Sequence, residues 1–469
     1  MKVYIIGIDG LELDILNHYE SFLPNFGKIR NKGCLGTINS VYPVDSVPAW
    51  QTIFTGLNPA QHGIVRGKDY VESLQDFEKI NNYNLKGNTF WDKISAQNKK
   101  CLILNPFLAY PAWRINGLMI SGPAFVEGDI SKYPESTHCN PAVYGGYKPT
   151  RRDKLKDDLL EALEDIKGLW KEFETHTQDQ EYDLCFITFT QLDRIQHYAW
   201  RFYDKGDPLH EEDVLLSDLI KKAYMLLDSF IGKILSKMND NDHLVIISDH
   251  GFGRRPYKLV NFNEIFRQHG LLKLSENKQI VNVRFIQKVR NFTIRTLSNL
   301  KVLDIVSKVA RKLPALRKYK KSDFLIDTDN SLCYTDQFFS GKNAYCGFNF
   351  GQIIKNGSEE KRNEVINKIK EIFSAHPELP RYKWMKTSNE LYKGKYAHRY
   401  PDICTELETG YGVEFDMFGE ILTDSVTHYV ISGGHCNPGT FGYYSKNNFQ
   451  QPCINSIDEF HNFLLSLFK

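Results

Sequence analysis

The chain has 469 residues, of which 42% are hydrophobic and 25% charged, and its net charge is +2. This composition is typical of a globular protein with a large core and excludes a disordered chain or a small disulfide scaffold. The balanced charge argues against nucleic-acid binding, and no stretch approaches the roughly 20 apolar residues that cross a bilayer. Nine scattered cysteines without a C-x-x-C pair, and an N-terminal apolar run too short for a signal peptide, predict reduced thiols and a cytoplasmic location.

Short apolar runs alternate with longer amphipathic stretches along the chain. The runs read as buried strands and cover residues 2–8, 100–105, 118–121, 183–188 and 243–248. Helical patterns cover residues 89–98, 153–173, 211–238 and 360–373, and a last strand-like run covers 429–434. This alternation predicts an α/β fold with a doubly wound, mostly parallel sheet flanked by helices. In such a sheet the functional residues lie at the carboxyl ends of the strands.

The alternation breaks between residues 256 and 343. Within this stretch, residues 284–321 contain twelve Lys and Arg but one acid, with apolar residues at partly helical spacing. We therefore expect a basic helical insert or cap over 256–343, and a discontinuous catalytic core formed by 1–255 and 344–469. The basic face is either solvated or docks on the anionic inner face of a membrane. Nucleic-acid binding is disfavoured because aromatic residues are sparse there.

Six carboxylates and imidazoles stand at or after the predicted strands: Asp9, Asp193, His197, Asp249, His250 and His435. Mixed Asp/His sets suit Zn²⁺ or Mn²⁺ rather than Mg²⁺ or Ca²⁺, and six ligands are enough for two ions that each keep an open position. Two metal ions roughly 4 Å apart can hold the attacking and leaving oxygens of a phosphoryl transfer. Asp193 and His197 are four residues apart, so they would face the same way on a helix.

Ser46 is a candidate nucleophile. Pro48 fits the first turn of a helix, which would place Ser46 near the N-cap. There the free N–H groups and the helix dipole favour an alkoxide or a bound phosphate. A serine hydroxyl is a poor nucleophile at neutral pH, and coordination to a metal would activate it. We assign the nearby His62 a structural role in a turn.

These residues lie in motifs that run from residue 5 to about residue 440. The motifs include IIGIDGLE, SVPAWQTIFTG, LDRIQHYAW, SDHGFG and SGGHCNPG. As a set they resemble the alkaline-phosphatase superfamily, and within it the type I phosphodiesterase/nucleotide pyrophosphatase family, in a prokaryotic branch with a D-R-I-Q-H motif. The resemblance implies an alkaline-phosphatase-like α/β fold and two divalent metal ions, with zinc favoured over manganese. It assigns one ion to Asp9, Ser46, Asp249 and His250, and the other to Asp193, His197 and His435.

The resemblance further implies a metal-dependent phosphodiesterase or nucleotide pyrophosphatase in which Ser46 replaces the more common threonine nucleophile. An Asn that holds the phosphate in nucleotide pyrophosphatases is replaced here by Gly67, flanked by Arg66 and Lys68. A cation at this position could hold the phosphate instead and favour a monoester or a pyrophosphate. A phosphomonoesterase, a phosphomutase and a non-catalytic phosphoester-binding protein therefore stay as alternatives. We expect a small-molecule or lipid-linked phosphoester substrate, and the sequence leaves the oligomeric state open.

Overall fold

The computed structural model describes residues 1–70, 85–144, 150–178, 180–275, 325–335, 344–415, 418–447, 452 and 454–469. The predicted basic segment 284–321 lies outside these residues. The chain divides into two compact units, of which the first comprises Met1–Arg254, Gly394–Arg399 and Val430–Lys469, and the second Arg255–Lys393 and Tyr400–Tyr429. Among the described helices, none combines the length and apolar character needed to cross a membrane.

An eight-stranded sheet in the order β2-β17-β7-β1-β6-β3-β4-β5 forms the centre of the first unit. Its strands are β1 (Val3–Ile8), β2 (Cys34–Ile38), β3 (Cys101–Leu104), β4 (Gly117–Ser121), β5 (Ser131–Tyr133), β6 (Leu184–Phe189), β7 (His243–Ile247) and β17 (Gly439–Ser445). The five strands from β7 to β4 are parallel, whereas β17 is antiparallel to both its neighbours and β5 is antiparallel to β4. The predicted α/β fold with a mostly parallel sheet is confirmed.

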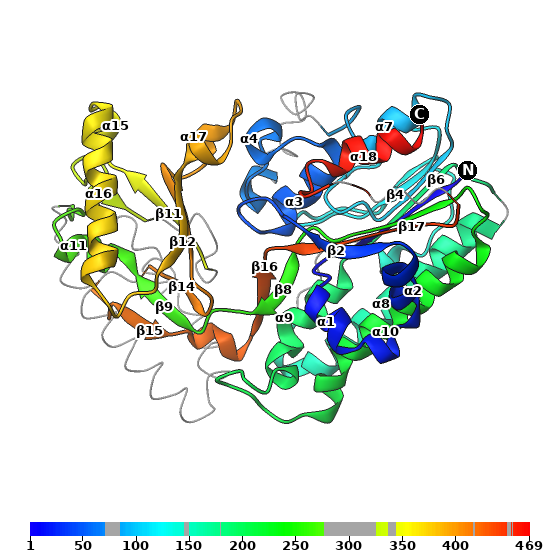
Figure 1. Cartoon of the computed structure of the whole chain (residues 1–469), viewed down its shortest axis with the longest axis horizontal. Coiled ribbons are helices and arrows are strands. Elements are labelled where there is room, and N and C mark those ends of the chain that lie inside the picture. The colour runs from blue at the N-terminus through cyan, green and yellow to red at the C-terminus, as the bar shows by residue number, and fades with distance from the viewer. Residues whose placement is uncertain are drawn as a thin grey trace. The chain divides into compact units, whose positions relative to one another are not determined.

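Helices cover both faces of this sheet (Figure 1). One face carries α3 (Ser46–Thr55), α7 (Phe90–Ser95) and α18 (Phe460–Leu467), with the short α4 (Pro59–His62) nearby. The other carries α1 (Leu13–His18), α2 (Pro24–Lys32), α8 (Leu155–Gln178), α9 (Gln191–Tyr203) and α10 (Val214–Lys237). Because the sheet is covered on both sides, β1 and β6 are apolar along nearly their whole length, as the sequence predicts.

The parallel order brings the ends of distant segments together. Strands β6, β1 and β7 are neighbours, so the residues that follow their carboxyl ends lie at one edge of the sheet. Strand β17 runs in the opposite direction, with Phe441 paired to Ile247. Its first residues therefore lie at the same edge, together with the short pair β8 (Gly251–Arg254) and β16 (Gly433–Cys436).

The described residues of the second unit form two smaller sheets. A four-stranded antiparallel sheet comprises β10 (Cys333–Tyr334), β11 (Tyr345–Phe350), β13 (Ile403–Leu407) and β12 (Tyr382–Thr387), and a three-stranded sheet comprises β14 (Tyr411–Glu414), β9 (Lys258–Asn261) and β15 (Leu422–Asp424). Its described helices are α11 (Phe262–Gln268), α15 (Gln352–Lys355), α16 (Glu359–Ala375) and α17 (Ser388–Leu391). This unit includes residues 344–393 and 400–429. The basic insert over 256–343 and the discontinuous catalytic core stay predictions.

The prediction of a strand at 429–434 is wrong. Tyr429 ends a 3₁₀ turn, and Val430 after it is 39% exposed. Pairing begins at Gly433, opposite Arg254, so His435 lies within β16 and faces Phe252 in the register. The remaining described 3₁₀ turns are η1 (Glu20–Phe22), η2 (Pro141–Val143), η3 (Arg152–Lys154) and η5 (Ala397–Arg399).

Gly7 in β1 packs closely against Trp50 of helix α3, and this packing can be tested by substitution. A Cβ at this position would lie 2.8 Å from Cη2 of Trp50, which is completely buried. We expect Gly7→Ala to lower the free energy of unfolding by about 1–3 kcal/mol, because the ring has no room to move without disturbing the core. Gly36→Ala in β2 is the matched control, since a Cβ there meets no atom within 4 Å. Urea unfolding measures both; equal stabilities for the two variants would contradict the prediction.

Candidate metal centre and nucleophile

Asp9, Asp249 and His250 form the first ligand group, all at most 2% exposed. Asp9 directly follows β1, and the other two follow β7, the next strand in the sheet. One ligand atom from each residue lies within 4.8 Å of the others. His250 Nε2 is 3.5 Å from Asp9 Oδ1 and 3.4 Å from Asp249 Oδ2. The carboxyl ends of two adjacent strands thus assemble three of the predicted ligands.

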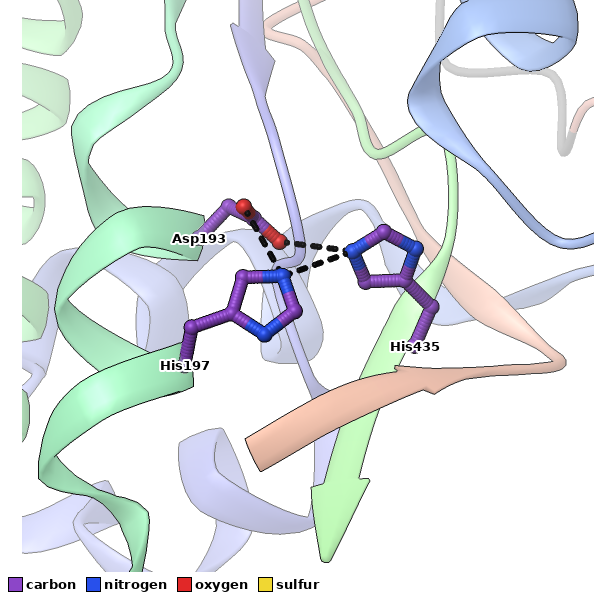
Figure 2. Close-up of side chains that lie close together, drawn as sticks. All are labelled: Asp193, His197 and His435. Carbon is purple, nitrogen blue, oxygen red and sulfur yellow. Dashed lines mark hydrogen bonds and ion pairs between the residues drawn. The ribbon is translucent and has the colours of Figure 1, made fainter. Parts of the chain in front are cut away.

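Asp193, His197 and His435 form the second group (Figure 2). Asp193 and His197 project from the same face of α9, which follows β6, and this confirms that their four-residue spacing aligns them on a helix. His435 arrives from β16 and completes the group. Its Nε2 lies 3.2 Å from Asp193 Oδ1 and 2.9 Å from His197 Nε2, and His197 Nε2 lies 3.4 Å from Asp193 Oδ2.

The three imidazoles share one hydrogen-bonding arrangement. Nδ1 of His197 lies 2.8 Å from the Gly433 carbonyl oxygen, and Nδ1 of His250 lies 2.9 Å from that of Gly251. Nδ1 of His435 lies 3.3 Å from the carbonyl oxygen of Val44. A carbonyl oxygen only accepts, so each Nδ1 carries a proton, and a ring without a second proton turns an unprotonated Nε2 toward the carboxylates. This is the tautomer that metal-binding histidines adopt.

The two groups adjoin and fit a pair of cations. The rings of His250 and His435 stack with their centroids 3.9 Å apart. Asp193 Oδ1 and Asp249 Oδ2 are buried and face imidazole Nε2 atoms, that of His435 at 3.2 Å and that of His250 at 3.4 Å. Because buried carboxylate oxygens are costly unless paired or bound to a metal, these atoms and the converging Nε2 lone pairs suit divalent ions.

The crowding of carboxylates shifts their pKa values. Burial, followed by the charges of Asp249 and Asp193, raises the pKa of Asp9 well above its usual value. Burial and Asp193 raise the pKa of Asp249 to about 8. Burial alone would also raise the pKa of Asp193, but His197 and His435 hold it below its usual value. Burial would lower the pKa of His435, yet the charge of Asp193 raises that pKa to about 9.

Ser46 is the first residue of α3 and lies beside the first ligand group. Its Oγ donates a hydrogen bond to Asp9 Oδ1 at 3.2 Å and lies 3.1 Å from His250 Nε2. The N-cap is Asp45, whose carboxylate accepts from the Val47 N–H, so Ser46 is one residue farther into the helix than an N-cap serine. The predicted nucleophile and the predicted ligands are therefore brought together.

Two residues have supporting roles that the sequence did not predict. The Trp50 indole Nε1–H donates to Asp9 Oδ2 at 3.1 Å, which fixes the carboxylate from within the core. Trp50 stands four residues after Ser46, and that spacing could have indicated a shared helix face. Ser248 Oγ accepts from the Leu11 N–H at 2.9 Å and donates to the His250 carbonyl at 2.6 Å. It thereby ties the loop after β1 to the loop after β7.

Other predicted residues lie around α4. His62 is buried and neutral, because burial lowers its pKa to about 3. Its Nδ1 accepts from the Ile64 N–H and its Nε2 lies 3.1 Å from Thr52 Oγ1, in keeping with the structural role expected of it. The Arg66 guanidinium pairs with the buried Asp69 carboxylate at 3.3 Å, and Lys68 is exposed. Their role as phosphate contacts stays a prediction.

We expect the metal-free protein to lose stability as the pH rises from 6.5 to 8. Over this range the folded protein keeps protons on Asp249 and His435, whose pKa values are about 8 and 9, whereas the unfolded chain has already lost the Asp249 proton and loses the His435 proton as the pH rises above 6.5. The unfolded state then binds fewer protons, so the free energy of unfolding falls by about 1.4 kcal/mol per pH unit for each such proton. Denaturant unfolding of chelator-treated protein at several pH values measures this slope.

Two further measurements check the origin of the slope. Asp249→Asn removes one titrating group and should flatten the dependence, and saturating Zn²⁺ should stabilise the protein more at pH 8 than at pH 6.5 because the cation competes with protons. His250 and His62 do not interfere, since burial lowers each pKa and their effect falls below pH 6.5. Stability that stays constant or rises over this range would show that the ligand groups do not retain these protons.

Comparison with known proteins places the chain in a family. A family model described as type I phosphodiesterase/nucleotide pyrophosphatase matches residues 3–416. The mouse (Mus musculus) ectonucleotide pyrophosphatase/phosphodiesterase family member 1 is 23% identical over 259 residues, and its human (Homo sapiens) counterpart is 30% identical over 261 residues. Each alignment covers 53% of this chain and 23% of the relative, so the chain spans about a quarter of the length of these relatives.

A solved structure, that of murine ectonucleotide pyrophosphatase/phosphodiesterase 5, aligns over 100% of this chain and 95% of its own, with 12% identity and a TM-score of 0.43. The prokaryotic branch expected from the D-R-I-Q-H motif stays a prediction. The family model, by contrast, covers most of the chain and includes Asp9, Ser46, Asp193, His197, Asp249 and His250. On this basis the protein belongs to the type I phosphodiesterase/nucleotide pyrophosphatase family.

Proposed function

We propose that the protein is a metal-dependent phosphohydrolase that cleaves phosphodiester or pyrophosphate bonds, with Ser46 as the nucleophile. The observation that carries this proposal is the position of Ser46 Oγ, within 3.2 Å of both Asp9 and His250 at the N-terminus of a ten-residue helix. Family membership supports the reaction class, and the curated relatives are named as nucleotide pyrophosphatases and phosphodiesterases.

We propose two divalent ions, with zinc favoured over manganese. One would be held by Asp9, Ser46, Asp249 and His250, and the other by Asp193, His197 and His435. The mixture of imidazole and carboxylate ligands supports a metal of this class. When bound, such ions supply positive charge that stabilises the attacking and leaving oxygens of an in-line displacement.

The chain's own residues would carry the covalent steps. The Ser46 hydroxyl gives up its proton to Asp9 Oδ1, to which it donates a hydrogen bond, and Oγ attacks phosphorus. The bond from phosphorus to Oγ forms while the bond to the leaving oxygen breaks, and the leaving oxygen takes a proton from solvent. Water then cleaves the phosphorylated Ser46 and restores the hydroxyl. The positive end of the α3 dipole favours the negative charge that develops on Oγ.

We expect Ser46→Ala to lower kcat by about 10³-fold or more, because no other group could form the covalent intermediate. Ser46→Thr is the matched control and should keep activity, since it retains the hydroxyl at the same helix position. Turnover of bis-p-nitrophenyl phosphate and metal content by mass spectrometry measure both effects. An alanine variant that keeps its metals and a large share of its kcat would refute the assigned nucleophile.

We further propose that the substrate is a diester or pyrophosphate rather than a monoester. The ion pair with Asp69 offsets the charge of Arg66, which leaves less positive charge for the second negative charge of a monoester. We expect a higher kcat/KM for bis-p-nitrophenyl phosphate than for p-nitrophenyl phosphate, with little change in that ratio on Arg66→Ala. A monoester preference that disappears in Arg66→Ala or Lys68→Ala would instead identify these side chains as phosphate contacts of a phosphatase or mutase.

The physiological substrate would be a small-molecule or lipid-linked phosphoester, and we propose that it is cleaved in the cytoplasm or at the inner face of the membrane. The scattered cysteines and the basic segment 284–321 support this location, although that segment lies outside the described residues. The curated relatives carry "ecto" in their names, so the location of this chain is a separate proposal. Cell fractionation that recovers the protein outside the cell or on the outer face of the membrane would contradict this location.

A further inference from the structure

The loop after β1, which begins with Asp9, is held by two side chains from outside it. Gln196 Nε2 donates to the Gly10 carbonyl at 2.7 Å, and Tyr224 Oη lies 3.1 Å from Gln196 Oε1. The Glu12 N–H donates to Tyr224 Oη at 3.0 Å. Gln196 comes from α9 and Tyr224 from α10, and both are completely buried.

The direction of each hydrogen bond in this chain is fixed. The Gly10 carbonyl only accepts, so the amide NH₂ of Gln196 must face it and Oε1 must face Tyr224. The Glu12 N–H only donates, so the Tyr224 hydroxyl oxygen accepts this hydrogen bond. The Tyr224 O–H in turn donates a hydrogen bond to Gln196 Oε1. One continuous chain of donors and acceptors therefore begins and ends on backbone groups of the same loop, two residues apart.

Gln196 stands between the two ligand groups. It lies on α9 between Asp193 and His197, and its side chain reaches the residue next to Asp9. The fit is close on both sides: a Cβ on Gly10 would lie 3.2 Å from Gln196 Nε2, and a Cβ on Gly433 would lie 2.4 Å from the Gln196 carbonyl oxygen. Gly433 in turn accepts from His197 and precedes His435 by two residues.

We propose that Gln196 and Tyr224 are positioning residues that set the spacing between the two metal sites. The inference rests on the proposed function, because it needs both ligand groups to hold an ion. Without the hydrogen bonds through Gln196 and Tyr224, the Asp9 loop would remain attached to the sheet but would no longer be fixed against α9. The distance between the ions would then change, and the affinity for the second ion would fall, while each group keeps its ligands.

The test uses the full-length protein loaded with Mn²⁺, in the variants Gln196→Met and Tyr224→Phe. Two Mn²⁺ ions at the spacing of a dinuclear site, roughly 3.5–4 Å, give an exchange-coupled electron paramagnetic resonance spectrum. We expect both variants to bind two ions at saturation, but with weaker coupling and a Kd for the second ion raised about tenfold or more. Hydrogen exchange at the Glu12 amide should also become faster in metal-free protein.

Tyr182→Phe is the matched control. Tyr182 is a buried tyrosine whose hydroxyl also bonds to a glutamine oxygen, that of Gln180 at 3.0 Å, but it precedes β6 and so lies at the opposite edge of the sheet. Its spectrum and both Kd values should match those of the wild type. If Gln196→Met does not fold, Tyr224→Phe decides the question, because it removes a single hydroxyl.

Unchanged coupling and unchanged Kd values in a folded Tyr224→Phe variant would overturn the inference and leave the proposed function intact. Wild-type protein that binds fewer than two Mn²⁺ or Zn²⁺ ions would overturn the two-metal proposal itself, and this inference with it. The wild-type stoichiometry and the variant spectra therefore separate the two failures.

Discussion

Mutual repulsion among three closely placed carboxylates constrains the rest of this structure. Asp9, Asp193 and Asp249 carry like charges in a region largely shielded from water, and burial and this repulsion raise the pKa of Asp9 and of Asp249. Such an arrangement is unfavourable unless positive charge compensates it. Protonated His435 supplies part of that charge beside Asp193. Divalent cations would supply more, which explains why a site of this composition suits metal-dependent chemistry.

Since the charges repel, packing must hold them in place. The three acids follow the adjacent strands β6, β1 and β7, whose register is fixed by backbone hydrogen bonds and by a continuous apolar core. Each histidine is oriented by a backbone carbonyl rather than by another side chain, so its Nε2 direction follows from the course of the chain. Trp50 fixes Asp9 in the same way from inside the core. The ligand geometry is therefore preorganised by elements that carry no charge themselves.

The sequence was sufficient to predict the parts that depend on local pattern. Uniformly apolar runs identified the five parallel strands to within one residue, and acids directly after them indicated the edge where ligands meet. The rest depended on long-range pairing. Strand β17 contains two glycines and enters the sheet against the general direction, so no local signal showed that it and β16 carry His435 to that edge. The Gln196–Tyr224 contact joins two helices, and neither residue alone differs from an ordinary buried polar side chain.

The same reasoning explains why Trp50 and Gln196, which support this loop, are buried and neutral rather than charged. A charged group next to the ligands would compete with the metal ions for the carboxylates, whereas the Trp50 indole and the Gln196 amide are neutral and have one fixed direction of donation. Both act on the same short loop, Trp50 on the Asp9 carboxylate and Gln196 on the carbonyl one residue later. Asp9 is therefore fixed at two points, by α3, which begins with Ser46, and by α9, which carries two residues of the second ligand group. Through this loop, the position of Ser46 and the position of the second ligand group depend on each other.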